Sequence, residues 1–206
     1  MLVGMPDTSV SRGRARPMSP EERRDTLIDV TLNLLREHGR NVTTRQIAEA
    51  AGVAEGTIFR VFETKEELVE AAITRAFEPG ALVDRLEEID PDAALRDRLV
   101  TLVAILQQRF RATFELMKKV GMIRPSDHAH GSPEAVAWRE RMQLMLVAVV
   151  GADAVRLRVP PEEFVHVLRL LTFAGSHPHI SDGRYLTPEE IVDVLTTGLL
   201  WPEERA

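Results

Sequence analysis

The segment from Thr43 to Leu68 constrains the fold of this chain most, because it specifies two short helices joined by a glycine turn. Thr43 and Gln46 are spaced as a capping box, in which side chain and backbone satisfy each other's free hydrogen-bonding groups, so a helix is expected from Thr44. The apolar residues that follow recur at helical spacing: Ile47, Ala48 and Ala51. Gly52 then ends that helix, because glycine adopts the left-handed conformation without a Cβ clash.

A second helix is expected from about Ala54 to Phe62. Ile58 lies four residues before Phe62, so both side chains share one helix face and are expected to be buried. The opposite, outward face then carries Glu55, Gly56, Thr57, Phe59, Arg60 and Val61. A face with threonine, arginine and an aromatic ring fits a nucleic-acid groove better than plain solvent.

A third helix is expected near Lys65, because Thr64 and Glu67 form another capping box. The three helices together have the order of a helix-turn-helix unit. Two helices around a glycine turn also occur as an ordinary corner in all-helical proteins, so the shape alone does not decide between the two interpretations.

The residue pattern resembles that of the tetracycline-repressor (TetR) family of transcription factors. Residues at matching positions, with no gap, are Thr43, Ile47, Ala48, Ala51, Gly52, Val53, Gly56, Thr57, Phe62, Lys65 and Leu68. The family also has an amphipathic helix before this motif, and Ser19, Pro20 and Glu22 predict one here that Gly39 ends. The resemblance implies an all-α fold, with an N-terminal three-helix helix-turn-helix DNA-binding domain followed by a helical ligand-binding and dimerisation domain.

Three residues depart from the family pattern. Ala54 replaces the usual serine, which removes an N-cap side chain worth about 1 kcal/mol in typical cases. Phe59 replaces a tyrosine and Val61 a histidine, so two polar groups at the DNA surface are lost. Arg60 lies between them and is expected to compensate by contacting a phosphate or a guanine edge. These departures leave the DNA-binding role in place, but the operator sequence cannot be carried over from the family.

Six residues are predicted to contact DNA. Thr44, Thr57 and Lys65 are expected at phosphates, and Arg45 and Arg60 at bases or phosphates. Phe59 is expected to pack on the sugar-phosphate edge.

The charge distribution supports this assignment although the net charge does not. The 206-residue chain carries a net charge of −6, which does not favour a nucleic-acid partner. The segment 1–18, however, holds Arg12, Arg14 and Arg16 without an acid among them, and a flexible arm there could reach a minor groove. An unstructured tail, upstream of a start at Met5 or Met18, is the alternative.

Beyond the arm, the sequence predicts two units: a helix-turn-helix domain over 19–66 and a helical sensing and dimerisation domain over 67–206. A fourth helix is expected to end at Pro79 and Gly80, and a long helical stretch to start at Asp90 and Pro91. Further helices are expected from Ser132 to Val150, from Pro160 to about Ala174 and from Thr187 to about Leu200. None of these segments shows the alternation typical of a strand.

A ligand pocket is predicted from aromatic and thioether side chains, which line adaptable apolar cavities. The candidates are Phe110, Phe114, Met117, Met122, Trp138, Met142 and Met145. Ordinary core packing is the alternative for each of them. A small, largely apolar effector could bind more tightly to one spacing of the two DNA-binding domains in a dimer. Its binding would then raise or lower the affinity for DNA.

A homodimer interface is implied by the resemblance, because the last two helices of TetR-like subunits pack as a four-helix interface. Candidate residues are Val165, Leu168, Leu171, Thr172, Gly175, Ile191, Val194, Leu195 and Gly198. Burial within their own subunit is the alternative, because apolar spacing does not identify the partner.

Other function classes receive little support. The chain has no cysteine, no phosphate-binding glycine loop and no activated-nucleophile motif, so no enzyme activity or cofactor is expected. Two His-x-His pairs, His128 with His130 and His177 with His179, are more consistent with solvated loops than with a metal site. No signal peptide or membrane span is expected, so a cytoplasmic protein is predicted.

The predicted function is thus a homodimeric repressor that binds a palindromic double-stranded DNA operator and is released by a small molecule. Two alternatives stay open: a helical ligand- or metal-binding protein with a degenerate head, and a TetR-like activator without an inducer.

Overall fold

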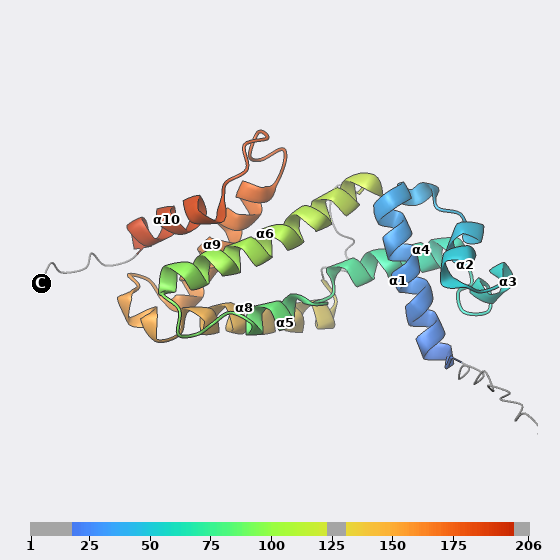
Figure 1. Cartoon of the computed structure of the whole chain (residues 1–206), viewed down its shortest axis with the longest axis horizontal. Helices are drawn as coiled ribbons and strands as arrows, with labels where there is room; N and C mark the ends of the chain where they lie inside the picture. The colour runs from blue at the N-terminus through green and yellow to red at the C-terminus, as the bar shows by residue number, and fades with distance from the viewer. Residues whose placement is uncertain (1–17, 123–130, 200–206) are drawn as a thin grey trace, which may run out of the picture.

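The computed structural model describes residues 18–122 and 131–199, and every secondary-structure element within these ranges is a helix. The predicted all-α class is therefore confirmed. The helices form a small N-terminal bundle and a larger C-terminal bundle at opposite ends of an elongated molecule (Figure 1).

We call the N-terminal bundle the head. It consists of α1 (Pro20–His38), the short 3-10 helix η1 (Gly39–Asn41), α2 (Thr44–Ala51), α3 (Glu55–Ile58) and α4 (Lys65–Phe77). The predicted start of α1 is confirmed: the backbone N–H of Ser19 donates to Glu22 Oε2 at 2.6 Å, and the N–H of Glu22 donates to Ser19 Oγ at 3.1 Å. These bonds satisfy donors that the first turn of a helix otherwise leaves free.

The predicted turn between α2 and α3 is also confirmed. Thr43 and Gln46 form the capping box, and Gly52 ends α2 with φ 67° and ψ 30°, the left-handed conformation. The helix α3 is shorter than the expected span to Phe62, because after Ile58 the chain continues as a turn. Ala54 at its N-cap offers no side-chain hydrogen bond, which agrees with the short length.

The head has its own hydrophobic core, built where α1, α2 and α4 face one another. Its buried members are Leu27, Ile28, Leu32, Leu35, Val42, Ile47, Ala48, Ile58, Phe62, Leu68, Val69, Ala72, Ile73, Leu116 and Val120. Four of them, Leu68 to Ile73, belong to α4, so α4 packs with the head although the expected domain boundary lies at residue 66. The last two come from the end of a helix of the other bundle.

The C-terminal bundle is arranged around one long helix, α6 (Leu95–Lys119). Its other elements are α5 (Leu82–Glu87), α8 (Pro133–Val150), the 3-10 helix η2 (Gly151–Arg156), α9 (Pro161–Ser176) and α10 (Pro188–Leu199). A second core joins them, with Leu99, Leu102, Leu106, Leu146, Phe164 and Ile191 among its most buried side chains. Figure 1 shows α6 running from this bundle to the head, where its end meets α1.

Two boundaries differ from the sequence-based expectation. The helix α5 was not predicted, and α6 begins at Leu95 and not at Asp90. Asp90 and Pro91 form a turn instead, in which Asp90 Oδ1 accepts the N–H of Asp92 at 3.0 Å and the Asp90 carbonyl accepts the N–H of Ala93 at 3.3 Å. A short side chain that bonds its own backbone in this way competes with the first helical turn.

Among the helices of the described ranges, none is long and apolar enough to cross a membrane.

Candidate nucleic-acid interface and adjoining cavity

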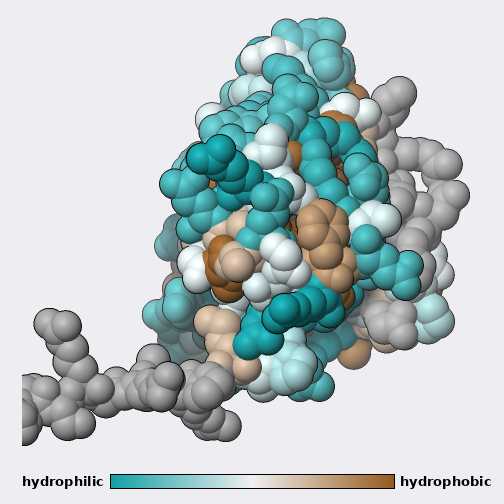
Figure 2. All heavy atoms as spheres, turned by 90° about the vertical axis from the view of Figure 1, so that its right-hand side faces the viewer, coloured by the Kyte–Doolittle hydropathy of each residue, from teal (hydrophilic) through white to brown (hydrophobic). Residues whose placement is uncertain are grey.

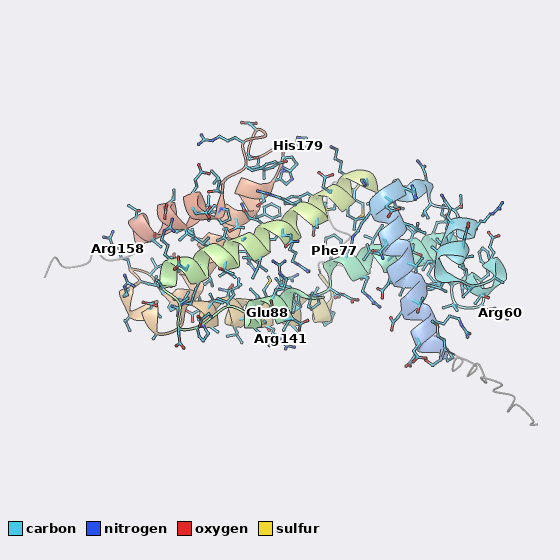
Figure 3. All side chains as sticks on the ribbon, in the orientation of Figure 1. Arg60, Phe77, Glu88, Arg141, Arg158 and His179 are labelled. Carbon is cyan, nitrogen blue, oxygen red and sulfur yellow. The ribbon has the colours of Figure 1, made fainter. Side chains whose placement is uncertain are left out.

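The six residues predicted to contact DNA lie on α2, α3 with the turn after it, and the start of α4. Arg45, Phe59 and Arg60 are exposed, and 52% of the surface of Phe59 is accessible. Thr44, Thr57 and Lys65 are half-buried. Arg60 lies at the tip of the head, at the opposite end of the molecule from Arg158 (Figure 3). The structure therefore gathers the six on one end of the protein; whether they contact DNA stays a prediction.

This end of the molecule is mostly hydrophilic around small apolar areas, as Figure 2 shows. Neither Arg45 nor Arg60 forms an ion pair within the part of the chain that the structure describes, so both guanidinium groups are available to a ligand. Exposed arginines beside an exposed aromatic ring can bind phosphates or base edges while the ring packs on the backbone.

Glu55 is a residue of this surface that the sequence analysis did not single out as a contact. The Thr44 hydroxyl donates a hydrogen bond to Glu55 Oε1, which joins the start of α2 to the start of α3. Thr44 is thus engaged within the head, and contact with a phosphate requires this bond to be exchanged. The only sequence signal was the placement of Glu55 on the outward face.

Gly56 leaves an open space on α3. A Cβ atom built at this position meets no heavy atom within 4 Å, and the backbone does not require a positive φ. Neither packing nor conformation within the protein therefore explains a glycine here. Glycine at this position leaves the helix backbone open to close approach from outside.

The orientation of the head depends on α1 and α4, which Arg75 of α4 joins. Its guanidinium group pairs with Asp25 at 2.5 Å and Asp29 at 3.1 Å, both on α1. The hydrogen bond to Asp25 is the main cause that raises the pKa of Arg75 above its usual value. These two ion pairs join α1 to α4.

The head is joined to α6 at two places. The first joint connects the end of α1 with the end of α6: Arg40 Nε donates to the carbonyl of Val120 at 2.9 Å, and Lys119 Nζ donates to the carbonyl of Arg36. Gly39 lies between these contacts with φ 60°, against the backbone of Lys119.

The second joint connects α6 with the end of α4. The Arg109 guanidinium donates to the carbonyls of Phe77 at 3.0 Å, Glu78 at 2.7 Å and Pro79 at 3.2 Å. These carbonyls lie at or just beyond the helix end, where helical partners are lacking and the helix dipole favours a cation. Burial lowers the pKa of Arg109 below its usual value.

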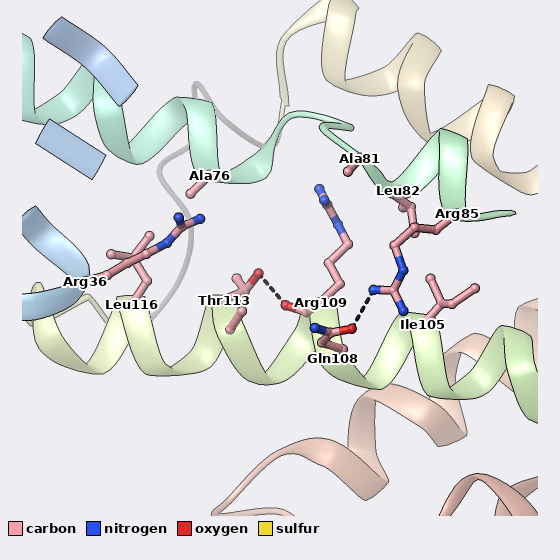
Figure 4. Close-up of a pocket in the computed structure, with 11 residues that line it drawn as sticks. Arg36, Ala76, Ala81, Leu82, Arg85, Ile105, Gln108, Arg109, Thr113 and Leu116 are labelled. Atoms are coloured by element: carbon pink, nitrogen blue, oxygen red, sulfur yellow. Dashed lines mark hydrogen bonds between the residues drawn. The ribbon is translucent and has the colours of Figure 1, made fainter. Parts of the chain in front are cut away.

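A cavity of about 220 Å³ lies between the two joints. Its walls come from α1, α4, α5 and α6, and consist of Arg36, Ala76, Ala81, Leu82, Arg85, Ile105, Gln108, Arg109, Ala112, Thr113 and Leu116. Figure 4 shows Arg109 between Arg36 and Arg85, each from a different helix, with the Arg85 guanidinium group directed at Gln108. The lining holds no aspartate or glutamate.

Comparison with known proteins identifies the head. Residues 27–72, from α1 into α4, match the family model described as bacterial regulatory proteins, tetR family. The N-terminal domain belongs to the tetR family. The recognition made from the motif is thereby confirmed.

Two curated relatives match mainly this tetR-family domain. The HTH-type transcriptional regulator YvkB of Bacillus subtilis (strain 168) is 39% identical over 72 residues, which are 34% of this chain and 37% of that protein. The HTH-type transcriptional repressor KstR of Rhodococcus jostii (strain RHA1) is 36% identical over 93 residues, 45% of this chain and 41% of that protein. The matches thus span less than half of either relative.

The fold of the described residues is similar to that of a solved TetR-type structure. A TetR transcriptional regulator from Agrobacterium tumefaciens aligns over 90% of this chain and 96% of its own, with a TM-score of 0.61 and 20% sequence identity. At this identity the similarity establishes the fold, including the helical C-terminal part.

The seven predicted pocket residues do not line the cavity described above. Phe110, Trp138, Met142 and Met145 pack against the C-terminal core, whereas Met122 packs against the head core. Phe114 stacks with Phe110 at a centroid distance of 6.4 Å, and Met117 is half-buried on α6. Five of the seven residues thus pack against one of the two cores, as the alternative of ordinary core packing predicts, whereas Phe114 and Met117 belong to neither core.

The predicted dimer residues also divide. Six are buried within their own subunit, which leaves no surface for a partner there: Val165, Leu168, Thr172, Gly175, Ile191 and Leu195. Leu171 is half-buried, while Val194 and Gly198 are exposed. The apolar spacing thus marks the face of α9 and α10 that is buried within the subunit. A face buried in its own subunit and a face buried against a partner have the same helical periodicity.

The histidine pairs give no metal site in the described residues. His128 and His130 lie outside those residues, as do Arg12, Arg14 and Arg16 of the arm. His177 Nδ1 accepts the backbone N–H groups of His179 and Ile180, each at 3.3 Å. Within the described ranges, no three histidines or carboxylates lie close enough to hold a metal ion together.

Proposed function

We propose that this protein is a sequence-specific DNA-binding transcriptional regulator, a homodimeric repressor of a palindromic operator from which a small ligand releases it. One observation carries the proposal: Arg45, Phe59 and Arg60 are exposed together on a tetR-family head. The curated names of the relatives, a transcriptional regulator and a transcriptional repressor, support it.

The proposed contacts follow from the exposure of each side chain. Arg60 has the free guanidinium group and the length to reach a base edge, whereas Lys65, half-buried at the first residue of α4, contacts phosphate. Gly56 lets the backbone of α3 approach the DNA. Phosphate contacts by Thr44 and Thr57 position the head.

Dimerisation is proposed through apolar side chains that the subunit's own core leaves exposed on its last two helices. On α9, Leu170 and Phe173 are 53% and 40% exposed, and on α10 Val194 is 65% exposed. A second copy would remove these surfaces from water. Two heads about 34 to 36 Å apart would then contact successive turns of one DNA face.

Selection from a random double-stranded DNA pool tests the proposal and identifies the operator in the same experiment. We expect enrichment of an inverted repeat whose half-sites lie about one helical turn apart, about 10 base pairs. The variant that combines Arg45→Ala with Arg60→Ala is the control and should enrich nothing. Absence of enrichment with the unaltered protein would contradict the proposal.

A ligand-binding protein with a degenerate head is the second candidate. It is favoured by the short α3, by the absent N-cap side chain at Ala54 and by the engagement of the Thr44 hydroxyl with Glu55. Salt-insensitive or absent DNA binding, together with intact ligand binding, would support this candidate against the first.

A further inference from the structure

We propose that the cavity between α1, α4, α5 and α6 binds a small carboxylate with a short apolar body, and that binding releases the end of α4 from Arg109. The inference rests on the proposed function, because it names the chemical class of the ligand that acts on the regulator. Nothing in the relatives' names assigns such a ligand to this cavity.

The charge of the lining selects an anion. Arg36, Arg85 and Arg109 line the cavity, and within residues 18–122 and 131–199 none of them pairs with a carboxylate. Arg85 Nη1 donates to Gln108 Oε1 at 2.5 Å, and Arg109 donates only to neutral carbonyls. Arg85 and Arg109 are partly buried, whereas Arg36 is exposed and its Nη1 donates to Asn33 Oδ1 at 3.2 Å. Partly buried cations without a counter-ion are unfavourable, so an anion that enters beside Arg85 and Arg109 gains charge-assisted hydrogen bonds.

The remaining walls limit the occupant to a small, partly apolar molecule. Ala76, Ala81, Leu82, Ile105, Ala112 and Leu116 provide the apolar surface. The volume of about 220 Å³ is below the roughly 300–1,000 Å³ of sites for drug-sized ligands. It corresponds to about seven water volumes at ~30 Å³ each. A short acyl or aryl carboxylate satisfies both the charge and the size.

Arg109 links occupation of the cavity to the head. It now stabilises the end of α4 by donating to Phe77, Glu78 and Pro79. A carboxylate carries a full negative charge and can accept two parallel N–H groups of a guanidinium group, so it competes with neutral carbonyls for the same donors. The end of α4 would then lose its hydrogen bonds to Arg109. Arg75 lies near that end and pairs with Asp25 and Asp29, so a displacement of α4 would be transmitted to α1.

Arg36 links the same anion to α1. Its side chain lines the cavity while its carbonyl accepts Lys119 in the first joint. One carboxylate held by Arg36 and Arg109 would therefore touch both joints between α6 and the head. A ligand with different affinities for two head positions shifts the equilibrium between them.

Isothermal titration calorimetry of the full chain, without DNA, tests the ligand class. The probes are straight-chain carboxylates from butanoate to decanoate with benzoate, and the primary amide and the amine of the same carbon skeleton. We expect at least one carboxylate to bind about tenfold or more tightly than its amide, and the amine not to bind. Equal binding of acid and amide, tighter binding of the amine, or no heat from any carboxylate would overturn the proposal.

Charge-removing variants locate the site. Arg36→Gln and Arg85→Gln should each weaken carboxylate binding about tenfold and leave amide binding unchanged. Arg111→Gln is the matched control, because Arg111 is an exposed arginine of α6 that lies over the Tyr185 ring and outside the cavity. An equal loss in Arg111→Gln would assign the effect to overall charge and overturn the site.

Hydrogen exchange separates the release of α4 from DNA binding. With the bound carboxylate, backbone amides from Arg75 to Gly80 should exchange faster, and unchanged or slower exchange would overturn the release. DNA binding is then measured with and without the same carboxylate. A protein that binds DNA but no carboxylate refutes this inference alone, whereas one that binds carboxylate at these arginines but no DNA refutes only the proposed regulator.

Discussion

A Cβ atom on Gly39 would lie 2.5 Å from the carbonyl oxygen of Lys119, so the end of α1 and the end of α6 approach each other at a distance that only glycine permits. This contact joins the head to the C-terminal bundle. With the bonds from Arg40 to Val120 and from Lys119 to Arg36, it forms a compact joint that connects the two cores.

Gly39→Ala should therefore be strongly destabilising. The backbone at Gly39, φ 60° and ψ −151°, is nearly inaccessible to other residues, and the opposing atom belongs to the backbone, which cannot rotate away. We expect a loss of about 2–4 kcal/mol in the free energy of unfolding, measured with urea. Gly121→Ala is the control, because Gly121 has φ 70° but no atom within 4 Å, and should lose only about 1 kcal/mol. Equal losses would show that the approach of α1 to α6 is unimportant.

Gly56→Ala should separate DNA affinity from stability. Alanine fits the open space on α3 and favours a helix by about 1 kcal/mol, so the unfolding free energy should stay equal or rise. Operator binding should weaken, since the added methyl group blocks close approach to DNA. Gly131→Ala, which also meets no atom within 4 Å and has no positive φ, should change neither property much. Unaltered operator affinity in Gly56→Ala would remove this residue from the interface.

Thr31→Val should stabilise the protein slightly. Thr31 is fully buried on α1, and its hydroxyl has no hydrogen-bond partner among the described residues. Replacement by a side chain of the same shape removes the unpaired polar group, which favours folding by about 1 kcal/mol. Thr172→Val is the matched control: its equally buried hydroxyl donates to Leu168 at 2.7 Å, and its loss should destabilise by about 1 kcal/mol. Urea unfolding of both variants measures the two changes in the free energy of unfolding. A lower free energy of unfolding for Thr31→Val would show that the Thr31 hydroxyl does have a stabilising partner.

Arg60→Ala and Lys65→Ala should weaken DNA binding in different ways. Loss of Arg60 should reduce the ratio of operator to random-DNA affinity, because a base contact costs about 1–3 kcal/mol. Loss of Lys65 should weaken both DNAs alike and lower the slope of log affinity against log salt by about 1. Titrations at several salt concentrations measure both quantities. Equal losses on both DNAs for Arg60→Ala would show that it contacts no base.

Leu170→Glu and Val194→Glu should dissociate the dimer. Each places a charge on an apolar surface that is exposed in the single subunit, so the fold should persist while association is lost. Leu144→Glu on α8, at a residue 69% exposed, is the control that should remain dimeric. Light scattering after size exclusion gives the mass. Dimers in all three variants would place the interface elsewhere.

The local sequence specified most of the head because its signals act over a few residues. Ser19 with Glu22, and Thr43 with Gln46, form the predicted capping boxes, and Gly52 has the predicted left-handed conformation. Thr64 accepts the N–H of Glu67 at the predicted start of α4. Such contacts depend on sequence neighbours alone. The helix α3 was predicted too long, because after Ile58 the chain forms turns, in which Arg60 N donates to Thr57 and Val61 N donates to Ile58.

The cavity could not be predicted, because its lining comes from four helices separated by up to 80 positions along the chain. Arg36, Arg85 and Arg109 resemble ordinary surface arginines when each is considered within its own helix. The seven aromatic and thioether residues were chosen by residue type, and the sequence of a helix does not show whether such side chains pack in a core or line a void. For the same reason, Leu168 and Ile191 were assigned to a partner although they pack within the subunit.

The central claim is that the head binds a specific DNA sequence, and fluorescence anisotropy tests it most directly. The protein is titrated with the operator obtained by selection and with a scrambled duplex of the same composition, at two salt concentrations. The account predicts two subunits per operator and an affinity about 10³-fold or more above that for scrambled DNA, with both affinities falling as salt rises. Equal affinity for the two duplexes, or no binding to either, would contradict it.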